Sequence, residues 1–301
     1  MAYIDPLGVD RIGNHDTAWY PLVIHSALAN SVEDISANIE SALQRDYIPF
    51  NKVIGTKSGA AAIVGSGPSL KANWQKLKKF KGDIIACNAS CQFLLERGIV
   101  PQYMMCFDAD PLMLEFITPH PDITYLLASR CPPKAFDMLA GCKVICWHAA
   151  ADETIEGLLD KHGRMEPMVI GGTAAITRAM ILVLPMGYKT VHIYGGDSSF
   201  ANGDTHIRKS TTNERRMAVM CDGRIFETAP WMTQQIEDFK QLAPKFRDLL
   251  GIKYIVHGDS LLAHIARLKG FETDFESRRK AVLKSGIRKW KHNATILWQH
   301  I

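Results

Sequence analysis

The chain lacks long hydrophobic runs: no apolar stretch approaches the roughly 20 residues that a membrane-spanning helix needs. Residues 1–10 also lack the basic start and the apolar stretch of a signal peptide. Both absences argue against a membrane-spanning or secreted protein, and we expect a cytoplasmic one. The 301 residues, of which 47% are hydrophobic and 22% charged, suffice for a large buried core.

The cysteines lack the spacing of a zinc site or of a disulfide framework. There are seven, an odd number, and no two of them form a Cys-x-x-Cys pair. Four lie in or beside apolar runs, namely Cys87, Cys106, Cys142 and Cys146. This pattern predicts buried, reduced thiols and argues against structural zinc.

The net charge of +4 is too small to indicate a nucleic-acid-binding protein by itself. Basic side chains are, however, concentrated near the C-terminus beside Trp290 and Trp298, at Arg278, Arg279, Lys280, Lys284, Arg288, Lys289 and Lys291. Such a segment fits weak contact with RNA, with lipid headgroups or with a protein partner. It equally fits a solvated helix with a basic face, and the sequence leaves these readings open.

The residue pattern divides the chain into three parts. We expect a helical N-terminal segment over residues 1–59, a Rossmann-like nucleotide-binding catalytic domain over 60–270, and a basic extension over 271–301. In the first part, Ser31 and Asp34 have the spacing of a capping box, and apolar residues then recur at helical intervals. They predict a helix that ends near Arg45 and lies outside the sheet.

From residue 60 onward, short apolar strands alternate with amphipathic helices. Strands are expected at 60–64, 83–87, 103–107, 123–128, 143–147, 189–194 and 253–257. Helices are expected at 69–80, 89–97, 132–140, 152–161, 172–186, 231–250 and 259–268. Continuous apolar strands between helices are typical of a parallel sheet covered on both faces. We therefore predict an α/β fold with a doubly wound, mostly parallel Rossmann-like sheet and helical N- and C-terminal extensions.

The first predicted strand runs directly into a glycine loop, which is the most informative segment of the chain. Its residues are Gly65, Ser66, Gly67, Pro68 and Ser69, and a helical pattern follows from Leu70. Glycines allow a ligand close to the backbone, and a helix N-terminus presents unpaired N–H groups and positive charge. The loop therefore predicts a phosphate site, with a βα turn that binds no ligand as the alternative.

The same loop departs from two well-known nucleotide motifs. The dinucleotide fingerprint needs a third glycine where Leu70 stands, and an acidic residue where Asn88 ends the second strand. The Walker pattern, with its lysine and following Ser or Thr, is also missing. These departures disfavour NAD and leave a loop suited to the phosphate or ribose of a nucleotide, with Asn88 beside it.

Carboxylates follow the third predicted strand at Asp108 and Asp110. Two carboxylates at this spacing can share Mg²⁺, which bridges diphosphate oxygens. The alternative is that Asp110 caps a short helix starting at Pro111 while Asp108 holds a loop.

Two further segments follow strands or open helices with small and polar residues. Gly171, Gly172 and Thr173 precede a long apolar helix, where they either bind an anion or allow that helix to pack closely on the sheet. Gly195 and Asp197 follow the strand at 189–194, and Asp197 is a candidate contact to a substrate hydroxyl or amine. His206 is a candidate general base, or else a surface histidine. A Gly-x-Ser-x-Gly elbow is missing, so the sequence does not support serine hydrolysis.

Taken in order, these motifs resemble the MptE-like family, which includes archaeal 6-hydroxymethyl-7,8-dihydropterin pyrophosphokinases and the motility accessory factors linked to flagellin glycosylation. The resemblance covers about residues 58–265. It is carried by Gly65 to Leu70, Asn88, Gly98 to Pro101 leading to Asp108, Gly171–Gly172, Met186 to Lys189, Gly195 to Asp197, and Gly203 to His206. The first and the later glycine motifs are also similar to those of bacterial sialyltransferases that use CMP-sugars and are reported to be metal-independent.

The resemblance implies a nucleotide-dependent transferase acting on a small-molecule acceptor. As a pyrophosphokinase, it would hold ATP over the glycine loop, bind Mg²⁺ through Asp108 and Asp110, and transfer diphosphate to a pterin-like hydroxyl. Asp197 would then orient the acceptor, and His206 would take its proton. The alternatives are a glycosyltransferase using a CMP-activated acidic sugar, and a nucleotide-binding module without catalysis. The sequence does not indicate the oligomeric state.

Overall fold

The computed structural model describes residues 30–150, 153–164, 166–201, 203–204, 206–207 and 216–275. Within these residues, ten strands form one sheet in the order β1-β6-β5-β4-β3-β2-β8-β11-β12, with β7 paired to β6, and every pairing is parallel. The strands are β1 (Ile48–Pro49), β2 (Ala60–Val64), β3 (Asp83–Cys87), β4 (Tyr103–Cys106), β5 (Thr124–Ala128), β6 (Lys143–Ala149), β7 (Met168–Val169), β8 (Thr190–Tyr194), β11 (Lys253–Val256) and β12 (Glu272–Thr273). The predicted doubly wound parallel sheet is confirmed.

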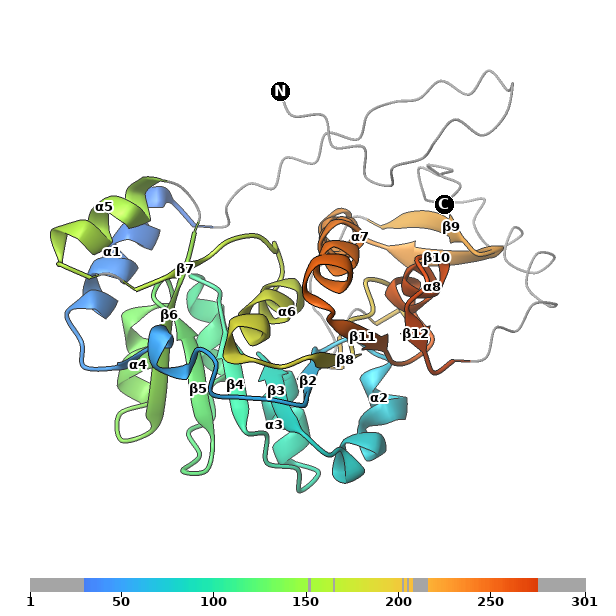
Figure 1. Cartoon of the computed structure of the whole chain (residues 1–301), viewed down its shortest axis with the longest axis horizontal. Coiled ribbons are helices and arrows are strands. Elements are labelled where there is room, and N and C mark those ends of the chain that lie inside the picture. Colours follow the sequence, from blue (N-terminus) through green and yellow to red (C-terminus); the bar gives the residue numbers. More distant parts are fainter. Residues whose placement is uncertain are drawn as a thin grey trace, which may run out of the picture.

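Helices cover both faces of this sheet. Figure 1 shows α6 and α7 on one side of the central strands, and α2 and α3 on the other. The α-helices are α1 (Val32–Leu43), α2 (Leu70–Asn73), α3 (Ser90–Leu95), α4 (Pro133–Met138), α5 (Glu153–Lys161), α6 (Ala175–Met186), α7 (Pro230–Leu250) and α8 (Leu261–Leu268). Three 3₁₀ helices are η1 (Phe50–Val53), η2 (Trp74–Lys79) and η3 (Pro111–Phe116). None of the described helices combines the length and the apolarity needed to cross a membrane.

The strand order changes direction at β2. From β2 the chain adds β3, β4, β5 and β6 on one side, and it then returns through α6 to place β8 on the other side. In such sheets, ligands bind outside the carboxyl ends of the strands at the point where the order reverses. The residues that follow β2 and β8 therefore occupy the position where a ligand is expected.

The core consists of the apolar strands that the sequence predicted. Ala61, Ala62, Ile63 and Val64 of β2 are fully buried, as is Val191 in the neighbouring β8. All seven predicted strands are present, with bounds that differ by at most two residues. All seven cysteines are free thiols and six of them are buried, which agrees with the expected reduced state.

Several elements differ from the expectations. Residues 48–49 form β1, which pairs with β6, so the N-terminal segment contributes to the sheet. Residues 69–80 do not form one helix: α2 ends at Asn73, whose Nδ2 donates to the Ser69 carbonyl at 2.9 Å, and η2 follows. Residues 1–29 and 276–301, including most of the basic extension, lie outside the described residues.

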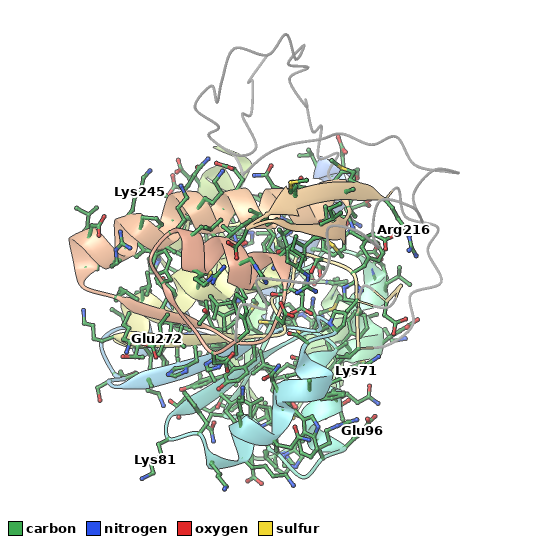
Figure 2. The ribbon with its side chains drawn as sticks, turned by 90° about the vertical axis from the view of Figure 1, so that its right-hand side faces the viewer. Lys71, Lys81, Glu96, Arg216, Lys245 and Glu272 are labelled. Carbon is green, nitrogen blue, oxygen red and sulfur yellow. The ribbon has the colours of Figure 1, made fainter. Side chains whose placement is uncertain are left out.

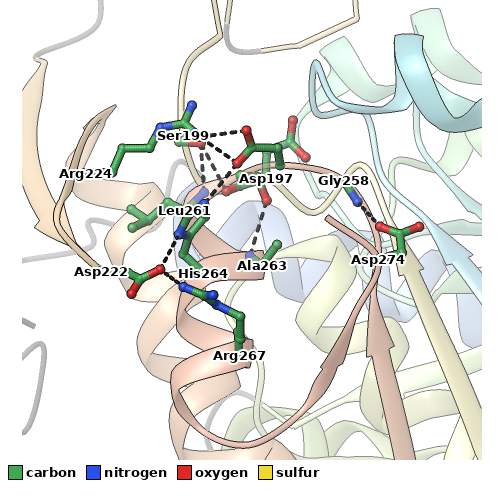
Figure 3. A network of polar contacts seen from close by, with 12 residues as sticks. Asp197, Ser199, Asp222, Arg224, Gly258, Leu261, Ala263, His264, Arg267 and Asp274 are labelled. Atoms are coloured by element: carbon green, nitrogen blue, oxygen red, sulfur yellow. Dashed lines mark hydrogen bonds and ion pairs between the residues drawn. The ribbon is translucent and has the colours of Figure 1, made fainter. Parts of the chain in front are cut away.

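A β-hairpin that the sequence analysis missed lies beside α7 and α8 (Figure 1). It consists of β9 (Met217–Cys221) and β10 (Arg224–Thr228), and it packs Val219, Cys221 and Phe226 against both helices. Polar contacts join the hairpin to α8 (Figure 3). His264 lies 3.2 Å from Asp222 and 3.0 Å from Asp259. Arg224 donates to Asp259 at 2.6 Å, and Arg267 pairs with Asp222. The hairpin is thus attached to α8 by polar contacts and to both helices by apolar packing.

We expect Tyr188→Phe to lower the free energy of unfolding by about 1–2 kcal/mol, because it removes a part-buried hydrogen bond to a carboxylate. The Tyr188 hydroxyl donates to Asp83, which also accepts from Lys57 Nζ at 2.9 Å. Tyr254 is the matched control, since its buried hydroxyl has no partner among the described residues. Tyr254→Phe should therefore be neutral or slightly stabilising in urea titrations. Equal losses in the two variants would contradict the role given to the Tyr188 bond.

Candidate functional site

A pocket of about 290 Å³ lies at the carboxyl ends of β2 and β8, where the strand order reverses. It is enclosed by the glycine loop after β2, the ends of β3 and β4, the first turn of α6, the loop after β8 and the start of α7. The lining residues are Gly65, Ser66, Gly67, Cys87, Asn88, Asp108, Thr173, Ala174, Ala175, Ile176, Gly195, Asp197, Ser198, His206, Trp231, Met232 and Gln235. Nine of these are residues that the sequence analysis selected.

The glycine loop and the turn after β8 lie in direct contact. The Gly67 amide donates to the Gly195 carbonyl at 2.8 Å, and the Gly65 amide donates to the Tyr194 carbonyl at 2.8 Å. A Cβ atom on Gly67 would lie only 2.6 Å from the Gly195 carbonyl oxygen, so a side chain does not fit there. Both loops therefore need glycine for close approach, in addition to any contact with a ligand.

Asp197 is hydrogen-bonded to the last residue of the glycine loop, Ser69. Its carboxylate accepts hydrogen bonds from the Ser69 amide, at 2.6 Å, and from the Ser69 hydroxyl. Burial raises the pKa of Asp197 to about 6, and the Ser69 hydrogen bonds limit this rise. Asp197 lines the pocket, whereas Pro68 and Ser69 do not. The role of Asp197 toward an acceptor stays a prediction, and the observed role is to hold the two loops together.

The two carboxylates expected to share a metal ion have different positions. Asp108 lines the pocket and accepts from Asn88 Nδ2 at 3.2 Å, whereas Asp110 does not line it. Asp110 instead caps η3 by accepting from the Leu112 amide at 2.8 Å, as the alternative reading predicted. Among the residues described, no three His, Cys, Asp or Glu side chains are placed to hold a metal ion together.

The Asp108 side chain is exposed at the pocket, but the protein that surrounds it at longer range partly desolvates its carboxyl. This desolvation raises the pKa of the Asp108 carboxyl, while the Asn88 hydrogen bond and the charge of Arg130 oppose the rise. Asn88 adopts a positive φ of 50°, which turns its side chain back toward the end of β4. Its Oδ1 atom is buried and has no hydrogen-bond partner among the described residues. Asn88 and Asp108 thus form a polar pair on one wall.

The first turn of α6 forms the opposite wall. Thr173, Ala174, Ala175 and Ile176 line the pocket, whereas Gly171 and Gly172 do not. A Cβ atom on Gly172 would lie 2.8 Å from the Arg178 amide, so this glycine serves close packing against the helix. The Thr173 amide and hydroxyl both donate to Asp238 of α7, at 2.6 and 2.7 Å. The helix begins at Ala175, three residues later than the sequence predicted.

The segment after β8 brings His206 to the pocket. The Ile207 amide donates to the Ser66 carbonyl at 2.7 Å, and Lys71 pairs with Asp204 at 3.2 Å. Arg216, at the start of the hairpin, donates to the Gly203 carbonyl at 3.4 Å. Figure 2 shows Lys71 and Arg216 on the same side of the molecule, one below the other. These bonds hold the backbone on both sides of His206 against the glycine loop and the hairpin.

The start of α7 contributes pocket residues that the sequence analysis missed. Trp231, Met232 and Gln235 line the pocket, and Ser198 Oγ donates to Gln235 Oε1 at 2.9 Å. The rings of Trp231 and His206 are nearly parallel, at 8°, with centroids 5.9 Å apart. Pro230 marked the helix start in the sequence, but nothing there placed this start near the glycine loop.

These observations define a Rossmann-like α/β protein with a ligand pocket at the switch point of its sheet. The family model described as "6-hydroxymethylpterin diphosphokinase MptE-like" matches residues 33–203, more than half of the chain. The chain therefore belongs to this MptE-like family, as its motifs predicted. Among curated proteins, no sequence matches the chain.

A solved structure supports the fold. The chain is similar to the MAf glycosyltransferase from Magnetospirillum magneticum AMB-1, with a TM-score of 0.58 and 15% sequence identity. The alignment covers 86% of this chain but only 40% of that protein, so the chain spans less than half of its length.

The buried Asp197 predicts a specific pH dependence of stability. Its folded-state pKa of about 6 exceeds the ordinary 3.8, so the folded state keeps a proton that the unfolded chain has released. The free energy of unfolding should therefore fall as pH rises from about 4 to about 6. Relative to Asp197→Asn, the wild type should lose about 1–3 kcal/mol across this range in chemical denaturation.

Asp274→Asn provides a control of opposite sign. Burial acts to raise the pKa of Asp274, but hydrogen bonds from His257, Lys76 and the Gly258 amide outweigh it and lower the pKa. The stability that Asp274 contributes is therefore present above its ordinary pKa and is lost as pH falls. For each variant, the quantity to compare is how its stability difference from the wild type changes with pH. A change in the same direction for Asp197→Asn and Asp274→Asn would contradict the environment described for Asp197.

Proposed function

We propose that this chain transfers a sugar from a nucleoside-monophosphate donor, such as a CMP-sugar, to an acceptor hydroxyl. The observation that supports this most strongly is that the glycine loop, the first turn of α6 and His206 line one pocket. The glycine loop, a helix N-terminus and a candidate general base thereby face the same space. The similarity of the fold to the MAf glycosyltransferase structure is consistent with this activity.

The donor phosphate would lie between the glycine loop and the first turn of α6. Gly65, Ser66 and Gly67 line the pocket, and the 12-residue helix α6 directs the positive end of its dipole at it. This arrangement suits a single phosphate. The Thr173 amide at the start of the helix already donates to Asp238, so it is not free to bind a second one. The Trp231 ring, 43% exposed at the pocket, offers a surface for the base or the sugar.

In the transfer step, the acceptor hydroxyl oxygen forms a bond to the anomeric carbon of the donor sugar. The bond between that carbon and the phosphate oxygen breaks, and its electron pair leaves with the nucleoside monophosphate. His206 takes the proton of the acceptor hydroxyl as general base. Asp108 and Asn88, which also line the pocket, would hold hydroxyl or amine groups of the bound sugar.

Diphosphate transfer from ATP is the second candidate, and the match to the MptE-like family model favours it. The acceptor oxygen would attack the β-phosphorus, and AMP would leave. Mg²⁺ bound to donor phosphates and to Asp108 would neutralise the charge that develops. We rank this reaction second because Asp110, the expected second carboxylate, caps η3 instead of lining the pocket.

Calorimetric titration with CMP and with ATP, each with and without Mg²⁺, separates the two candidates. We expect CMP to bind with an affinity that Mg²⁺ leaves unchanged, and ATP to bind at least about tenfold more weakly. The physical reason is that the pocket offers one phosphate position between two backbone elements. Tight ATP binding that requires Mg²⁺ would instead favour diphosphate transfer, and binding of neither nucleotide would contradict both reactions.

We expect His206→Ala to slow release of CMP from a CMP-sugar by about 10²–10⁴-fold, which is the usual contribution of a general base. CMP affinity should change little, because the phosphate is held by backbone groups. His162→Ala, at the end of α5 and away from the pocket lining, is the matched control. Tight CMP binding with no release of CMP by the wild type would identify a nucleotide-binding module without catalysis.

A further inference from the structure

A lysine-rich surface follows the glycine loop and lies outside the pocket. Residues 47–82 contain seven lysines and no Asp or Glu. Five of these lysines lie on α2 and η2 or directly after η2, and all five are exposed: Lys71, Lys76, Lys78, Lys79 and Lys81. None of the five lines the pocket, and Figure 2 shows Lys81 pointing away from the protein. We call these five side chains the lysine surface.

The apolar side chains of the same segment turn the lysines outward. Leu70 and Leu77 are buried in the main core, and Trp74 and Phe80 are half-buried against it. These four residues recur at helical intervals, so one side of α2 and η2 packs on the core. Because the apolar side is already covered by protein, the outer side of this segment offers charge and no apolar face.

Most of the charge on this surface is not neutralised by the protein. Lys71 pairs with Asp204 at 3.2 Å, and Lys76 pairs with Asp274 at 2.6 Å. Among the described residues, no carboxylate forms an ion pair with Lys78, Lys79 or Lys81. Three neighbouring ammonium groups therefore repel one another with water as their main solvation, which favours an anionic partner.

The basic segment near the C-terminus is attached to the described chain beside this surface. Asp274, the partner of Lys76, is the last residue but one of the described part of the chain. From residue 277 onward the sequence contains seven Lys and Arg residues and no Asp or Glu. The sequence thus adds further positive charge close to the lysine surface and no acidic residues that would neutralise it.

The aromatic ring within the lysine surface is poorly placed to contact nucleic-acid bases. Lys78 Nζ lies 5.0 Å from the centroid of Trp74, and the guanidinium carbon of Arg97 lies 5.7 Å from it. Proteins that bind single strands without sequence preference stack bases on aromatic rings. Trp74 is half-buried and has cations over its ring, so the surface suits an array of phosphates without bases.

We propose that the lysine surface binds the anionic headgroups of a lipid bilayer, so that the chain associates peripherally with a membrane. The proposal does not depend on the proposed transferase activity. Clusters of about four to eight basic residues are typical of contacts with anionic lipids, and each such residue raises the affinity about fivefold. Since the apolar side of α2 and η2 is packed on the core, the contact is electrostatic and does not insert into the bilayer.

Sedimentation of the 301-residue chain with lipid vesicles tests the surface. The wild type should bind vesicles of phosphatidylcholine mixed with phosphatidylglycerol, but not vesicles of phosphatidylcholine alone. A variant that combines Lys78→Gln, Lys79→Gln and Lys81→Gln should bind the anionic vesicles about a hundredfold more weakly, because it removes three unpaired charges. Its melting temperature should be that of the wild type, since all three side chains are exposed. Binding by the wild type should be lost in about 1 M salt, where charges are screened within about 3 Å.

A variant that combines Lys134→Gln, Lys143→Gln and Lys245→Gln is the matched control. These three lysines are also exposed and lie on α4, β6 and α7, and the variant removes the same net charge. It should keep nearly the wild-type affinity for anionic vesicles. Equal weakening in the two triple variants would show an effect of net charge and overturn a local surface. Undiminished vesicle binding by the Lys78, Lys79 and Lys81 variant would also overturn it.

Titration with single-stranded and duplex RNA at the same salt concentration tests the other class of polyanion. We expect the wild type to bind both RNAs more weakly than it binds the anionic vesicles. Tighter binding to RNA than to vesicles, lost in the Lys78, Lys79 and Lys81 variant, would assign the surface to nucleic acid and overturn the lipid proposal.

Discussion

The contact between the loops after β2 and β8 is the constraint on which the pocket depends. The Gly67 amide donates to the Gly195 carbonyl, and the buried Asp197 carboxylate accepts from the amide and hydroxyl of Ser69. Without the Ser69 bonds, Asp197 would be a buried charge with no partner in these loops, which is strongly unfavourable. The contact also fixes the segment that carries His206, because Ile207 donates to the Ser66 carbonyl. The glycine loop and the segment with the candidate base are therefore positioned by the same few bonds.

The central strands could be predicted from the sequence because each is a continuous buried apolar run between helices. The two-residue strands β1, β7 and β12 could not, since two residues carry no periodicity and pair only once the longer strands are in place. The hairpin formed by β9 and β10 had a local signal in Asp222–Gly223, both at positive φ between alternating side chains. That signal was present in the sequence and was overlooked.

The pocket lining was predictable where it follows from position along a strand. Gly65, Asn88, Asp108 and Gly195 line the pocket because the carboxyl ends of parallel strands meet at one edge. The spacing of Asp108 and Asp110 did not decide whether Asp110 binds a metal ion or caps a helix, since an Asp before Pro suits a cap equally well. In the structure it caps η3. Trp231 and Gln235 line the pocket because of how α7 packs in the folded chain, which is tertiary information.

The position of β2 between β3 and β8 also has a consequence for how the chain emerges from the ribosome. One edge of β2 pairs with β3, which follows about twenty residues later in the chain. The other edge can pair only after β8 (Thr190–Tyr194) has been synthesised. At ordinary synthesis rates, the hydrogen-bonding groups on that second edge stay unpaired for roughly ten seconds. An apolar strand with an open edge is a template for pairing between chains. The centre of the finished sheet is thus its most aggregation-prone part during translation.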